Sequence, residues 1–140
     1  MSAEDNKTIA AAVFRAAWNR GDFGPADEYV DPDVVDHFDD SRGIAAFKGL
    51  IRGFRSAFAD LELTVLLEIA EGDLVVHHWT LAGTHTGELK RIPPTGKSVT
   101  WTGTTIVRID HGKIVERWAS VDVLGILQQL GAVAPPPGAR

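Results

Sequence analysis

The first twenty residues have the apolar spacing of an amphipathic helix. Five apolar side chains fall on one helical face: Ile9, Ala12, Val13, Ala16 and Ala17. Residues three or four positions apart share a face of a helix, so this stripe predicts a helix that packs on a core. Ser2 is a good N-cap and Gly21 a good C-terminal stop. We therefore expect the helix to begin after Ser2 and to end at Gly21.

Two more helices and a short strand are expected before residue 60. Pro25 suits the first turn of a short helix over residues 25–30, and residues 34–38 have the composition of a short strand. Ser41 is expected to cap a third helix that runs to about residue 58. Its apolar residues follow the helical period: Ile44, Phe47, Ile51, Phe54 and Phe58. One face of this helix should therefore pack on a sheet.

After Asp60 the period changes from that of a helix to that of a strand. Residues 61–65 alternate apolar and polar side chains, as a half-buried strand does. Three long strands are expected over residues 74–83, 98–109 and 114–122, with turns near 71–73 and 110–113. A short helix over residues 123–130, stopped by Gly131, would follow them.

Helices followed by an antiparallel meander are typical of an α+β fold. We expect a cone-shaped, strongly curved antiparallel sheet that wraps around the N-terminal helices and encloses a pocket between them. Pockets of this kind are mostly apolar, with a few converging polar groups. One domain is expected over residues 1–133, followed by a Pro-rich tail over residues 134–140.

Composition and charge narrow the function. Hydrophobic residues make up 44% of the 140 residues and the formal net charge is -5, which excludes a disordered chain and leaves no basic surface for nucleic acid. No cysteine is present, so disulfides and thiol nucleophiles are excluded. No apolar run approaches the roughly 20 residues of a membrane span. The acidic, polar start argues against a secretory signal, so a cytoplasmic location is expected.

The last predicted strand carries an unusual set of side chains on one face. Glu116, Trp118, Ser120 and Asp122 have the same parity there. A pocket lined by an aromatic ring and carboxylates would explain them, and so would an exposed polar face with one Trp at an oligomer contact. Asp122 is the sharpest candidate for a general base. Its position just before a helix favours an N-cap, and the two roles are compatible.

Histidines in three other parts of the sequence are candidates for the same pocket. His77 and His78 are adjacent, so they point to opposite faces of their strand and one of them faces the interior. The pattern leaves open which one does. His85, where the strand meets its loop, either lines the pocket mouth or bonds to loop backbone. His37 could reach the pocket from the helical side, whereas His111 lies in a turn and is expected to be solvated.

Other catalytic signatures are missing. The five histidines have no i, i+4 helical pair and no metal-ligand spacing. Glycine-rich phosphate loops and a serine nucleophile elbow are also missing. The sequence therefore favours proton transfer or ligand binding without a metal or cofactor.

Four segments together resemble the SnoaL-like polyketide cyclases, within the nuclear-transport-factor-two-like and ketosteroid-isomerase-like superfamily. The segments that carry the resemblance are residues 83–87 (GTHTG), 93–97 (PPTGK), 110–118 (DHGKIVERW) and 122–131 (DVLGILQQLG). The resemblance implies a cone-shaped α+β barrel, usually dimeric or tetrameric. It also implies aldol ring closure of an aromatic polyketide ester without a metal or organic cofactor. Asp122 matches the family's catalytic aspartate, and Arg108 stands where the cyclases have an assisting histidine.

These observations lead to one functional hypothesis and its rivals. The leading hypothesis is a cofactor-free acid/base enzyme acting on a hydrophobic, carbonyl-bearing small molecule, in which Asp122 removes a proton next to the carbonyl. The oxyanion would be stabilised by Arg108, His78 or His85. The walls of the pocket would be formed by Trp118, Trp101, Trp79, Phe14, Trp18 and His37. The rivals are another reaction on the same fold (isomerase, dehydratase, hydroxylase-like or epoxide-opening) and a non-catalytic binding or dimerisation module.

Overall fold

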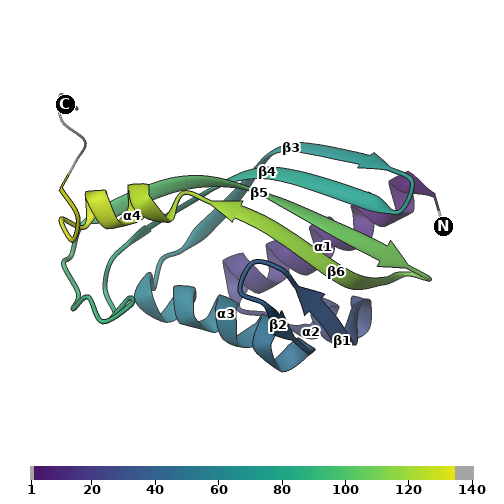
Figure 1. Cartoon of the computed structure of the whole chain (residues 1–140), viewed down its shortest axis with the longest axis horizontal. Coiled ribbons are helices and arrows are strands. Elements are labelled where there is room, and N and C mark those ends of the chain that lie inside the picture. Colours follow the sequence, from purple (N-terminus) through teal and green to yellow (C-terminus); the bar gives the residue numbers. More distant parts are fainter. Residues whose placement is uncertain (1, 135–140) are drawn as a thin grey trace.

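The computed structural model describes residues 2–134. Three of its helices precede the four long strands along the chain, and a short fourth helix follows them (Figure 1). The helices are α1 (Ala3–Arg20), α2 (Gly24–Tyr29), α3 (Ile44–Ala57) and α4 (Val123–Gln129). The strands are β1 (Val30–Asp36), β2 (Ser41–Arg42), β3 (Glu62–Glu71), β4 (Leu74–Thr84), β5 (Ser98–Asp110) and β6 (Lys113–Val121). All but the first residue of the expected Pro-rich tail lies outside the described residues.

Local side-chain chemistry explains both ends of α1, whereas α3 begins at a different residue from the one predicted. Ser2 and Asp5 form a capping box, and Gly21 ends α1 with a φ of 63°, a conformation that glycine adopts without a steric penalty. At α3 the N-cap is Gly43 rather than Ser41. Ser41 instead lies in β2, where its hydroxyl donates to Asp39. The expected cap is wrong because this short strand occupies the residues that would have preceded a helix turn.

The sheet has six strands in the order β2-β1-β6-β5-β4-β3. Four neighbouring pairs are antiparallel, but β1 runs parallel to β6. The sheet is therefore mixed, whereas a wholly antiparallel one was expected. About 75 residues separate these two strands, so no tight hairpin dictates their direction.

One face of the curved sheet is covered by helices. Figure 1 shows α1 and α3 on the same side of the long strands, and the buried apolar residues of these elements form one continuous core. On β4 and β5 the residues with odd numbers point into this core, including Val75, Trp79 and Val107. On β6 the inward positions from residue 117 onward are Arg117, Ala119 and Val121, which pair with inward residues of β5. No helix of the described residues is both long and apolar enough to cross a bilayer.

An irregularity in β3 reverses its alternation. Val65 pairs with Trp79, but Leu67 pairs with His78, so one extra residue is inserted between them. A β-bulge of this kind exchanges the two faces of the strand beyond it. Glu68 therefore lies opposite His77 on the inner face. Leu67 and Ile69 are each 59% exposed on the outer face.

Candidate functional site

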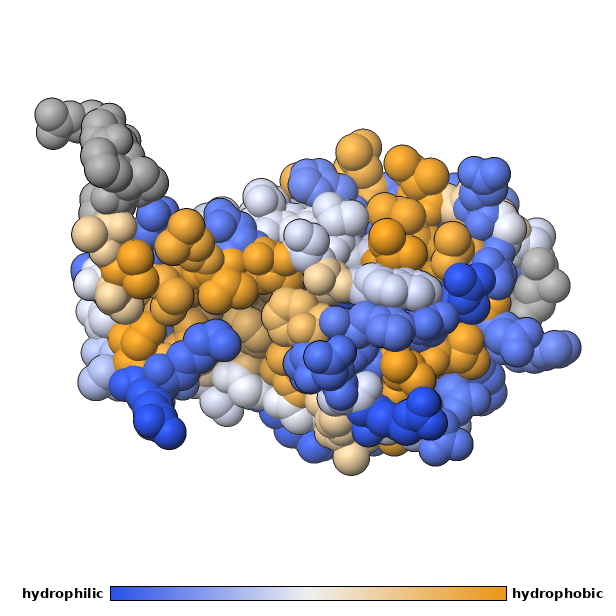
Figure 2. Space-filling view, viewed as in Figure 1, coloured by the Kyte–Doolittle hydropathy of each residue, from blue (hydrophilic) through white to orange (hydrophobic). Residues whose placement is uncertain are grey.

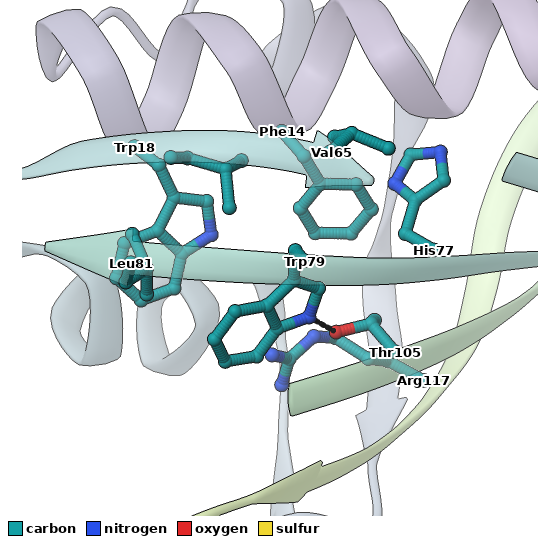
Figure 3. A pocket seen from close by; sticks show the side chains of 9 residues that line it. Phe14, Trp18, Val65, His77, Trp79, Leu81, Thr105 and Arg117 are labelled. Carbon is teal, nitrogen blue, oxygen red and sulfur yellow. Dashed lines mark hydrogen bonds between the residues drawn. The ribbon is translucent and has the colours of Figure 1, made fainter. Parts of the chain in front are cut away.

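A small cavity lies between α1 and the inner face of the sheet. Its volume is about 20 Å³, enough for roughly one water molecule. The lining comes from α1 and from four strands, and most of it is apolar (Figure 3). The residues are Phe14, Trp18, Leu63, Val65, His77, Trp79, Leu81, Thr105 and Arg117. Three polar side chains, His77, Thr105 and Arg117, therefore meet in an otherwise hydrophobic interior.

His77 is the titratable base of this cavity. Its side chain is 4% exposed, its ring lies edge-on to Phe14 at 6.0 Å, and its Nε2 is 2.7 Å from Glu68 Oε2. Burial lowers the pKa of His77, and the hydrogen bond to Glu68 opposes that shift in part. A neutral imidazole that donates its Nε2 proton to Glu68 keeps an electron pair on Nδ1, the atom that a general base needs.

Trp79 and Thr105 shape the wall next to His77. The indole Nε1 of Trp79 donates to Thr105 Oγ1 at 2.8 Å, as the dashed line in Figure 3 marks. The indole lies directly over Gly103, where an added Cβ would stand 2.3 Å from Trp79 Cζ2. Since no side chain fits there, glycine at residue 103 is required for this orientation of Trp79.

Arg117 and Asp36 form an ion pair at the floor of the site. The parallel register of β1 and β6 places them opposite each other, and Arg117 Nη1 donates to Asp36 Oδ2 at 2.8 Å with both side chains buried. Asp36 Oδ1 also accepts from the backbone N–H of Phe38. Arg117 Nε has no partner among the described residues. This buried N–H is a free donor in a residue that lines the cavity, where it can bind an oxygen of a ligand.

Asp122 does not lie in the cavity. Its side chain is exposed, and Oδ1 accepts from the backbone N–H of Gly125 as the N-cap of α4. The expected enclosure of this carboxylate in an apolar pocket is therefore wrong. The reason is strand parity: Glu116, Trp118 and Ser120 all belong to the outer face of β6, and Asp122 follows them just past its end.

Three other predicted site residues lie on the outer face of the sheet, around Glu116 of β6. His37 stacks on Trp118 with ring centroids 5.1 Å apart, and its Nε2 is 2.7 Å from Glu116 Oε2. Arg108 bonds to Glu116 and Asp73. The hydrogen bond from His37, and then that from Arg108, hold the pKa of Glu116 below its usual value. This network faces away from the cavity, so the expected placement of Arg108, His37 and Trp118 in the pocket is wrong.

The two remaining histidines and Trp101 also lie outside the cavity lining. His78 is on the outer face, 3.3 Å from Thr104 Oγ1. His85 is fully buried, and its Nδ1 accepts from the backbone of Thr95. Trp101 is buried against Phe58. Of the ten predicted site residues, Phe14, Trp18 and Trp79 are therefore the ones that line the cavity.

The prediction missed three polar residues of the inner face: Glu68, Arg117 and Thr105. It also left open whether His77 or His78 faces the interior. One signal was present for His77, because its neighbours of the same parity, Val75, Trp79 and Leu81, are more apolar than those of His78. No comparable signal existed for Glu68, whose orientation depends on the bulge. Within residues 2–134, no three His, Asp or Glu side chains converge as metal ligands would.

Comparisons with known proteins agree with this architecture. Residues 8–130 match the family described as SnoaL-like polyketide cyclase. Aklanonic acid methyl ester cyclase DnrD of Streptomyces peucetius is 32% identical over 111 residues, which cover 79% of this chain and 77% of DnrD. Nogalonic acid methyl ester cyclase of Streptomyces nogalater is 31% identical over 121 residues, or 83% of this chain and 90% of that protein.

Two solved structures have the same fold. AclR of Streptomyces galilaeus, to which a hydroxylase activity has been attributed, superposes with a TM-score of 0.86 at 33% identity. That match covers 98% of this chain and 87% of AclR. TsrD of Streptomyces laurentii superposes with a TM-score of 0.87 at 29% identity, covering 95% of this chain and 99% of TsrD.

Proposed function

Because the chain belongs to the SnoaL-like polyketide cyclase family, we propose that it is a cofactor-free acid/base enzyme. Its substrate would be a hydrophobic, carbonyl-bearing small molecule, and its reaction an intramolecular aldol ring closure. The supporting observation is that buried His77, which is paired with the half-buried Glu68, lines the same apolar cavity as Arg117, whose Nε–H has no partner among the described residues. A base and an oxyanion donor are the two groups that this chemistry needs.

The proposed steps use only side chains of the inner face. His77 Nδ1 takes a proton from the carbon next to a carbonyl, and the electron pair moves onto the carbonyl oxygen. Arg117 Nε–H stabilises that enolate oxygen, and Glu68 stabilises the imidazolium. The enolate carbon then attacks a second carbonyl of the same molecule. The new alkoxide recovers the proton from His77, so the product is an isomer of the substrate.

The assignment of the base has a direct test. Aklanonic acid methyl ester and nogalonic acid methyl ester are the first compounds to assay, because the relatives' names contain them. His77→Gln should lower kcat by about 10²- to 10⁴-fold, the usual contribution of a general base. Glu68→Gln should lower kcat less than His77→Gln, since it removes only the partner that stabilises the imidazolium.

Asp122 provides the matched control. Asp122→Asn should keep both kcat and stability, because Asn caps a helix about as well as Asp. If Asp122→Asn abolishes turnover while His77→Gln retains it, the catalytic base is the exposed carboxylate and our assignment is refuted. Circular dichroism of each variant would show that the fold is intact.

Hydroxylation is the second candidate, and the similarity to AclR favours it. An oxygen electrode distinguishes the two reactions. Aldol closure consumes no oxygen and leaves the mass of the substrate unchanged, whereas hydroxylation consumes oxygen and adds about 16 Da. Oxygen uptake that depends on substrate would replace the cyclase proposal.

A further inference from the structure

A second hollow lies beside α3, outside the inner cavity. Its volume is about 280 Å³, and it is bounded by α3, the turn after β1, the loop after β4 and the start of α4. Figure 2 shows hydrophobic side chains gathered over this part of the surface, between the α3 and α4 of Figure 1. The apolar wall consists of Phe38, Leu50, Phe54, Leu89 and Val123. We call this hollow the α3 groove.

The α3 groove and the inner cavity share a wall. Phe54, which lines the groove, packs on Trp18, which lines the cavity, with ring centroids 5.8 Å apart. Phe38 lines the groove, and the guanidinium of Arg117 lies 6.0 Å from its ring centroid. A ligand that lies against Phe38 in the groove is therefore separated from Arg117 by that one ring.

The volumes of the two hollows indicate which one can hold the larger part of a substrate. Sites for drug-sized ligands measure roughly 300 to 1,000 Å³. The inner cavity of about 20 Å³ cannot hold a ring system, but the groove of about 280 Å³ can hold most of one. The body of a large ligand therefore fits in the groove, with its reacting end at the wall that the groove shares with the cavity.

Two glycines on α3 support the same conclusion independently. Gly49 and Gly53 are four residues apart inside the helix, and both line the groove. Glycine inside a helix is destabilising relative to alanine. A Cβ added at either position meets no atom of residues 2–134 within 4 Å, so packing among these residues does not require glycine there. Both missing side chains leave open space on the groove side of the helix.

We propose that the α3 groove binds the flat, apolar ring system of the substrate and that Gly49 and Gly53 provide the surface on which those rings lie. A methyl group at either position would occupy the ligand's volume. The choice of a ring-bearing small molecule as occupant rests on the proposed function. The location of the site rests on the groove, its shared wall with the cavity and the two glycines.

The test compares stability with ligand affinity in glycine variants. The probe is anthraquinone-2-sulfonate, and its Kd is measured by quenching of tryptophan fluorescence. Gly49→Ala/Gly53→Ala should weaken binding tenfold or more, while its Tm rises by roughly 5 °C because alanine is the better helix former. Ser56→Ala is the matched control: it improves the same helix at an exposed position outside the groove and should leave Kd unchanged.

A second variant fills the groove from its opposite wall. Val123→Phe adds bulk from α4 and should also weaken binding, without any change in α3. If both this variant and the double alanine variant bind the probe as tightly as the wild-type chain, the groove is not the site and the proposal is overturned.

Measuring probe binding and turnover together distinguishes a failure of the groove proposal from a failure of the proposed function. His77→Gln should bind the probe normally and lack turnover, because His77 lies beyond the shared wall. Turnover that depends on His77 and is unaffected by the double alanine variant would refute the groove and leave the function standing. The opposite result is also informative. If the wild-type chain turns over no ester but binds the probe, and the double alanine variant loses that binding, the groove is supported and the proposed function is refuted.

Discussion

Removing the charge of Asp36 should destabilise the protein strongly. Asp36→Asn keeps the acceptor for the backbone N–H of Phe38 but deletes the charge opposite Arg117, whose Nη1 lies 2.8 Å from Asp36 Oδ2. Both side chains are buried, and Arg117 Nε already has no partner in the part of the chain that the structure describes. Leaving one member of a buried pair alone typically costs about 3 to 5 kcal/mol. That is a large share of the 5 to 15 kcal/mol that stabilises a typical domain.

Urea denaturation followed by tryptophan fluorescence measures this effect. The midpoint should fall with an unchanged m-value, and Tm should drop by roughly 10 to 20 °C. Asp36→Leu/Arg117→Met is the control, because replacing both charges by apolar groups of similar size is often neutral or stabilising. The double variant should recover most of the stability and still lack turnover, since it has no donor for the enolate oxygen.

Two results would refute this reasoning. A cost below about 1 kcal/mol for Asp36→Asn would mean that water reaches Arg117 and that the pair resembles a surface ion pair. Full activity of the stable double variant would mean that Arg117 is structural and takes no part in the reaction.

Three further predictions concern the same inner face. The acid limb of kcat/KM should have its midpoint below 6.5, because burial lowers the pKa of His77, and this limb should disappear in His77→Gln. Gly103→Ala should cost about 1 to 3 kcal/mol in urea denaturation and shift the fluorescence of Trp79, because the new Cβ overlaps the indole. Deletion of Leu66 should remove the bulge but leave kcat close to wild type, because Val65 can still pair with Trp79 and Glu68 with His77 in a regular ladder. A deletion variant that loses activity as Glu68→Gln does would contradict this register argument.

Several elements were predictable because their signals are local. The capping residue Ser2, the stop at Gly21 and the apolar stripe between them depend on side chains within a few positions of each other. The hairpin between β5 and β6 was placed correctly for the same reason, since His111 and Gly112 both adopt a positive φ there. The parallel pairing of β1 with β6 has no local signal, and it was missed.

The candidate site was harder to predict than the elements that form it. Alternation shows which residues of a strand share a face, but both faces of β6 contain a charged residue. Trp118 suggested that its face was the inner one. In the structure that ring instead stacks on His37 on the outer face.

Local sequence patterns were sufficient to indicate the α+β class, most element boundaries and the resemblance to the cyclases, since these depend on neighbours along the chain. The inner face itself was set by contacts between distant segments. The helices cover one side of the sheet, a single inserted residue in β3 turns Glu68 toward His77, and β1 brings Asp36 to Arg117. A shift of one residue in a strand exchanges its two faces without changing its composition. Asp122 has the carboxylate that a general base needs, but the pairing of β6 with its neighbours places it on the surface.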